Sequence, residues 1–189
     1  AEGKTLAALN AGLFAGRLSE QIASRIIAVR RNLAESVVRT YCIGKGVALA
    51  VNPIPIADVL AASAIDAGMV MHLGKIYGMD LNREEAGELL TVVGKQMAVV
   101  GVVSWLSSAL KGATFGISTV ITAGVQGVIG YYGSYIVGQA AERYFIQGKS
   151  WGAHGPKQVI QDILASTDRD SILQQARADI LQRLRTQTS

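Results

Sequence analysis

The feature that most constrains the fold is a stretch of thirty residues, Gly112 to Ala141, that contains no Asp, Glu, Lys, Arg or His. Seven of the thirty residues are glycine. At helical steps of three and four residues, small side chains align on one face while Ile, Val and Tyr occupy the other. A smooth face of this kind is typical of helices that pack closely against another helix. The predicted packing seam comprises Gly112, Gly116, Gly127, Gly130, Ser134 and Gly138.

The glycines of this stretch also predict that the helix is buried. Each glycine inside a helix is less favourable than alanine by about 0.8–1 kcal/mol. A helix with seven of them therefore needs close packing or a surrounding that enforces backbone hydrogen bonding. A bilayer and the interior of a helical bundle both meet this requirement. The Ser, Thr and Gln residues of the stretch keep the second environment open.

The preceding segment predicts a second apolar helix. Asn82 and Glu85 have the spacing of a capping box, which favours a helix from Arg83 to about Leu110. Its second half, from Gln96 to Leu110, is uncharged. A short junction at Lys111 would join it to the glycine-rich helix as an antiparallel hairpin, a candidate membrane hairpin.

The beginning of the chain predicts a long, basic, amphipathic helix from Thr5 to about Tyr41. The net charge of +4 is concentrated between Arg17 and Lys45, a segment that contains six basic residues and two acidic residues. Because aromatic residues are not interleaved with these charges, nucleic acid is not the expected partner. Anionic lipid headgroups are the simpler partner, and a merely solvated face is the alternative. The candidate headgroup contacts are Arg17, Arg25, Arg30, Arg31 and Arg39.

Prolines divide the next part of the chain. The apolar segment from Gly44 ends at Pro53 and Pro55, where a helix must break. A new helix is expected from Pro55 to Gly78, and two polar-faced helices are expected after residue 147, at Pro156–Ala165 and Asp168–Arg185. The fold class is therefore all-α. We predict a basic amphipathic helix in 1–45, an apolar helical core in 46–146 and C-terminal helices in 147–189.

Catalytic and cofactor motifs are lacking. His72 and His154 do not have the spacing of metal ligands, and the single cysteine, Cys42, is expected to be a buried thiol. Gly3-Lys4-Thr5 lacks the preceding strand of a phosphate-binding loop. The sequence predicts no enzyme and no cofactor.

Two carboxylates stand out because they lie in an apolar segment. Asp58 falls near the start of the predicted helix, where the helix dipole stabilises it. Asp66 is expected to pair with Lys75, His72 or an arginine of the first helix, since an unpaired buried carboxylate is costly. Proton or ion handling by Asp58 and Asp66 is the alternative.

A resemblance supports this interpretation. The segments Asn52–Asp58, Ala67–Met71 and Ile76–Gly78 resemble the signature of domain-of-unknown-function family 697 over roughly Tyr41 to Trp151. The flanking sequences are similar to cyanobacterial members. The candidate motif residues are Pro53, Pro55, Asp58, Asp66, Tyr77 and Gly78.

The resemblance implies a membrane-associated domain, often found after an Era-like small GTPase domain. We therefore expect a non-enzymatic domain that anchors or assembles a GTPase-type protein. If the candidate hairpin spans a bilayer, the basic stretch from Arg17 to Lys45 predicts that both termini are on the cytoplasmic side. The expected partners are the bilayer, a GTPase domain in the same or another chain, and a second copy of the domain. Because the sequence lacks an initiating Met, it is expected to be a piece of a longer protein. A soluble regulatory or dimerisation module and a small channel or transporter are the alternatives.

Overall fold

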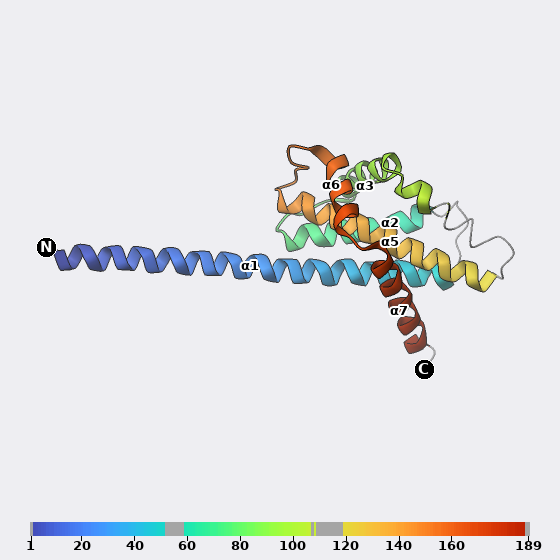
Figure 1. Ribbon diagram of the computed structural model, residues 1–189, viewed down its shortest axis with the longest axis horizontal. Coiled ribbons are helices and arrows are strands. Elements are labelled where there is room, and N and C mark those ends of the chain that lie inside the picture. The colour runs from blue at the N-terminus through green and yellow to red at the C-terminus, as the bar shows by residue number, and fades with distance from the viewer. Residues whose placement is uncertain (1, 52–58, 107, 109–118, 188–189) are drawn as a thin grey trace.

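The computed structural model describes residues 2–51, 59–106, 108 and 119–187, and within these ranges all regular structure is helical. The all-α prediction is confirmed. Figure 1 shows the arrangement of the main helices. They are α1 (Glu2–Val51), α2 (Val59–Ile76), α3 (Arg83–Val99), α5 (Thr119–Ile146), α6 (Gly155–Ser166) and α7 (Arg169–Gln187). A short helical segment follows α3 at residues 102–106.

Helix α1 is longer than predicted and runs without a break from Glu2 to Val51. At 1.5 Å per residue its 50 residues extend over about 75 Å. It continues through the domain boundary that we expected at residue 45. Its C-terminal part belongs to the helical body, and its N-terminal part projects far beyond it (Figure 1). Every residue from Gly16 to Leu33 is exposed, and Ala34 is the first residue of α1 described as buried.

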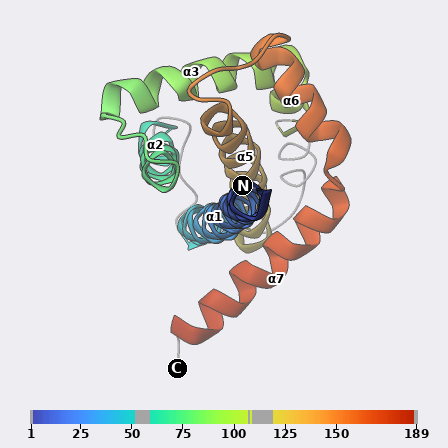
Figure 2. The same cartoon turned by 90° about the vertical axis from the view of Figure 1, so that its left-hand side faces the viewer.

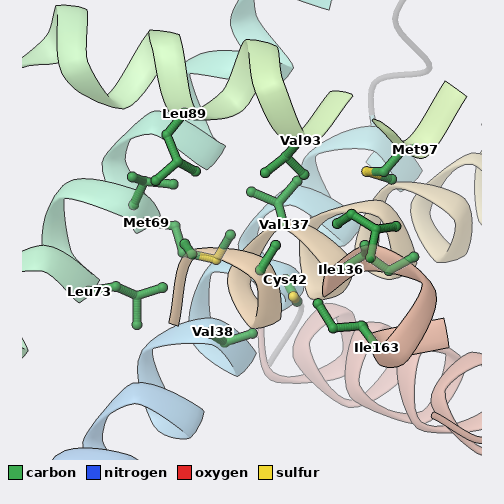
Figure 3. Close-up of a cluster of buried hydrophobic side chains, with 14 of the residues drawn as sticks. Val38, Cys42, Met69, Leu73, Leu89, Val93, Met97, Ile136, Val137 and Ile163 are labelled. Carbon is green, nitrogen blue, oxygen red and sulfur yellow. The ribbon is translucent and has the colours of Figure 1, made fainter. Parts of the chain in front are cut away.

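The helical body is built around α5, which packs most extensively against α1 and also contacts α2, α7, α6 and α3. The view along α1 in Figure 2 shows α2, α3, α6 and α7 arranged around this pair. The hydrophobic core draws side chains from all six of these main helices, with Ala176 as the contribution of α7, and Figure 3 shows part of it. They include Val38 and Cys42 of α1, Met69 and Leu73 of α2, Leu89, Val93 and Met97 of α3, Ile136 and Val137 of α5, and Ile163 of α6.

Two predicted helix ends are confirmed in atomic detail. Asn82 and Glu85 form a reciprocal capping box at the start of α3. Gly78 adopts φ +74° just after α2, where the amides of Gly78 and Met79 donate to the carbonyls of Lys75 and Gly74. This pair of hydrogen bonds is the Schellman motif, which needs a residue that tolerates positive φ after the helix.

The prediction of one helix from Arg83 to Leu110 was wrong. Helix α3 ends at Val99, and Gly101 turns the chain with φ +83°. The turn redirects the chain so that Val102 becomes buried and Trp105 packs edge-on against Tyr132, with ring centroids 5.6 Å apart. The uncharged segment from Gln96 is thus divided between two helices. Among the helices in the described part of the chain, none combines the length and the apolar character needed to cross a bilayer.

Candidate functional site

The projecting part of α1 carries a continuous row of exposed apolar side chains, which we call the arm stripe: Leu18, Ile22, Ile26, Val29 and Leu33. Their spacing of three or four residues places them on one face of the helix. About half of each side chain is exposed, from 46% for Leu18 to 57% for Val29. Large apolar side chains exposed in a row mark an interaction surface rather than a random surface composition.

Two arginines, Arg25 and Arg30, flank the arm stripe on the surface of α1. At 100° per residue, Arg25 and Arg30 fall about 60° and 80° to either side of its middle. Arg17 and Arg31 lie on the opposite face, together with Glu20, the one acidic residue between Arg17 and Leu33. The surface is therefore an apolar strip bordered by positive charge.

The arm stripe extends an interface that is already formed inside the protein. The same row continues along α1 as Val37 and Tyr41, which pack against the core. Tyr41 contacts α2, where its ring meets that of His72 edge-on at 6.1 Å. Because α2 ends at Ile76, the row continues outward without a covering helix in the described structure.

Arg39, the remaining predicted headgroup contact, is bound to another helix, although its side chain is 56% exposed. Its guanidinium donates two hydrogen bonds to Asp179 of α7, at 2.6 and 3.1 Å. The Tyr131 hydroxyl of α5 also donates to Asp179, at 3.0 Å. These bonds join α1, α5 and α7, and the bonds to the Asp179 carboxylate raise the pKa of Arg39. Because its guanidinium is bound to Asp179, Arg39 is not part of the positive border of the arm stripe.

Asp66 pairs with a cation of the first helix, but with Lys45 rather than an arginine. The Lys45 Nζ lies 2.6 Å from the Asp66 carboxylate, and both side chains are about nine-tenths buried. The buried Ser134 hydroxyl donates to the other carboxylate oxygen. Three helices, α1, α2 and α5, thus meet at one buried carboxylate.

A third buried carboxylate, Glu142 of α5, lies near the point where the arm leaves the body. The Tyr77 hydroxyl donates to it at 2.8 Å, and Arg31 and Glu35 of α1 and Arg143 contribute longer-range charge. No cation lies within ion-pair distance among the described residues. Burial raises the pKa of Glu142, and this effect exceeds the lowering by Tyr77 and the arginines.

This raised pKa makes stability depend on pH. The pKa of Glu in an unfolded chain is about 4.3. Because the pKa of Glu142 is higher in the folded protein, the folded state binds the proton more tightly than the unfolded state does. The folded state therefore loses stability as the pH rises from about 4.3 through the folded pKa. We expect Glu142→Gln to raise the free energy of unfolding at pH 7 by about 1 kcal/mol while keeping the bond from Tyr77. Urea denaturation at pH 4 and pH 7 would measure this. An equal gain at both pH values would show that ionisation of Glu142 is not the cause.

The described part of the predicted packing seam faces α1 and α2. A Cβ added to Gly127 would lie 2.5 Å from the carbonyl oxygen of Gly46, and one added to Gly138 would lie 2.7 Å from Val38. Gly130 is similarly close to Leu49. The partner of the seam in this structure is therefore mainly α1, whereas the hairpin prediction placed it against the preceding helix.

Several predicted residues lie outside the described part of the chain: Pro53, Pro55, Asp58, Gly112 and Gly116. Sequence reasoning also missed the residues that complete the buried polar contacts, Lys45, Tyr131, Glu142 and Asp179. Glu142 offered one signal, because it is the first charged residue after the uncharged stretch. Asp179 offered none, since it is one of several charged residues of α7 and no local pattern sets it apart from the others.

Metal-binding groups and the single cysteine can be compared with the sequence predictions. The described side chains include no group of three or more His, Cys, Asp or Glu residues that could hold a metal ion. Cys42 is buried, as predicted, and its burial raises the pKa of the thiol. A thiol of this kind is a poor nucleophile because the thiolate is the reactive form.

Comparison with known proteins gives one match. No curated protein and no solved structure matches the chain. A family model matches residues 13–169, a longer range than the resemblance predicted from the sequence. Because this range covers most of the chain, the protein belongs to the family described as Domain of unknown function (DUF697).

Proposed function

We propose that this domain is a non-enzymatic module that binds an anionic membrane surface through the projecting part of α1. The arm stripe is the observation that carries the proposal. A helix that presents an apolar face bordered by Arg or Lys lies in the membrane interface, with its apolar side chains in the acyl region and its cations near the phosphates. Arg25 and Arg30 occupy the bordering positions, from which long side chains can reach the headgroups.

The pattern of the stripe favours lipid over a coiled coil with a second copy. A two-stranded coiled coil needs apolar residues at both heptad positions over three to four heptads. The heptad set by Ile22, Ile26, Val29 and Leu33 places Ser19, Ser36 and Thr40 at the next seam positions. The apolar repeat is thus too short for stable pairing.

This mode of attachment replaces the candidate hairpin as the proposed membrane contact. The association with a GTPase domain in the same or another chain stays a prediction of the family resemblance. A homo-oligomeric state also stays a prediction, as does the cytoplasmic position of the termini that the basic stretch from Arg17 to Lys45 predicts. The channel alternative stays untested; in the structure, Asp66 is bound by Lys45 and Ser134.

Flotation with liposomes tests the proposal. We expect the protein to float with vesicles that contain an anionic phospholipid and to bind weakly to purely zwitterionic vesicles. The double variant Ile22→Asp/Ile26→Asp should bind at least tenfold more weakly, because it removes two apolar anchors of about 1.5 kcal/mol or more each and adds negative charge. Arg25→Gln/Arg30→Gln should weaken binding by up to about thirtyfold, at about 1 kcal/mol per charge, most strongly at low salt.

A matched control separates apolar contact from charge. Gln21→Asp/Ser24→Asp adds the same two negative charges away from the arm stripe, so its binding should fall much less than that of Ile22→Asp/Ile26→Asp. Equal losses in the two double variants would contradict insertion of the stripe. A dimer in plain buffer that dissociates in Ile22→Asp/Ile26→Asp, without any flotation, would favour pairing between copies instead.

A further inference from the structure

A second apolar surface, independent of the arm stripe, lies between α5 and α7. We call this the α5–α7 groove; its volume is about 590 Å³. The lining residues are Ala50, Trp105, Gly124, Val125, Val128, Ile129, Leu173, Arg177, Ile180, Leu181 and Leu184. We infer that this groove binds a long-chain fatty acid, with the acyl chain along the apolar lining and the carboxylate at Arg177.

The lining fits a hydrocarbon chain. Ten of its eleven residues have no charge and no polar side-chain group other than the indole nitrogen of Trp105. The volume lies within the range of about 300–1,000 Å³ that is usual for small-molecule sites. Leu181, which is 55% exposed, lies on the wall contributed by α7, so the groove opens to solvent.

Arg177 supplies the charge complementarity that selects an acid. It is the one charged residue in the lining, and it is exposed. Other arginines near this end of the protein are engaged, since Arg39 binds Asp179 and the guanidinium of Arg169 stacks over Trp105 at 4.7 Å. Arg177 has no hydrogen bond or ion pair within the described residues. A guanidinium at the mouth of an apolar groove matches a carboxylate in bidentate geometry.

The fluorescence of Trp105, which lines the groove, can be used to measure binding of the fatty acid. The protein has two tryptophans, and Trp105 lines the groove whereas Trp151 packs against Tyr144 elsewhere, with ring centroids 4.8 Å apart. In a Trp151→Phe background, all tryptophan fluorescence comes from Trp105. A dibrominated stearic acid, kept below its micelle concentration, should quench this fluorescence saturably, and oleic acid should reverse the quenching.

Two variants locate the acid within the groove. A Cβ at Gly124 meets no atom within 4 Å, so Gly124→Leu fills the groove without a clash at Cβ and should weaken binding at least tenfold. Gly94→Leu on α3 is its control, because Gly94 is equally open but lies outside the groove. Arg177→Gln should weaken binding of the acid several-fold without affecting the corresponding alcohol, whereas Arg183→Gln, outside the lining, should bind normally.

The outcomes are distinct from those of the membrane proposal. The Ile22→Asp/Ile26→Asp variant should bind the fatty acid normally, because the arm stripe does not line the groove. Quenching that does not saturate, or that is unchanged by Gly124→Leu, would overturn the proposal. So would a dimer that dissociates in Gly124→Leu without any binding of the acid, because a second copy would then be the occupant.

Discussion

Lys45→Met should lower the free energy of unfolding by about 3–5 kcal/mol, which is the usual cost of removing one partner from a buried ion pair. The substitution keeps most of the side-chain volume but leaves the Asp66 carboxylate about nine-tenths buried without its cation. The Ser134 hydroxyl supplies one hydrogen bond, which does not offset the loss of a positive charge at 2.6 Å. Chemical denaturation followed by circular dichroism measures the difference.

A second substitution at the partner position tests the cause. In Lys45→Met/Asp66→Leu both charges are gone, so most of the lost stability should return and the double variant should be clearly more stable than Lys45→Met alone. The Ser134 hydroxyl then loses its acceptor, at a cost of about 1 kcal/mol or more. If the double variant were less stable than Lys45→Met, loss of packing rather than the unpaired charge would explain the effect.

The helices and several of their ends could be predicted because their signals are local. The capping box of Asn82 and Glu85 and the terminal glycine at Gly78 involve residues within a few positions of each other. The amphipathic character of the first helix follows from the same short-range spacing. Local patterns of this kind do not depend on which helices become neighbours.

The partners of the buried polar groups could not be predicted, because they are far apart in the sequence and meet only when the helices pack. Lys45 and Asp66 are 21 residues apart, and Arg39 and Asp179 are 140 residues apart. The seam on α5 was visible in the sequence, but its pattern does not identify the helix that lies against it. The break at Gly101 was missed because an isolated glycine inside a helical pattern is compatible with either continuation or a turn.

The seam itself gives the second large effect, and it can be tested with two glycines of the same helix. Gly127→Ala places a methyl group 2.5 Å from the Gly46 carbonyl oxygen and 3.0 Å from the Ala50 Cβ, and a backbone atom cannot move aside without shifting α1. We expect a loss of about 2 kcal/mol, because the steric cost of overpacking exceeds the gain in helix propensity.

Gly133→Ala on the same helix meets no atom within 4 Å, so only the propensity gain of up to about 1 kcal/mol applies and the variant should be more stable than the parent. Urea unfolding of both variants should therefore separate them by about 3 kcal/mol, the combined size of these two effects. If Gly127→Ala were stabilised as much as Gly133→Ala, α1 and α5 would not be packed at this distance. The arm of α1 would then not be held to the body by close contact between Gly127 and Gly46.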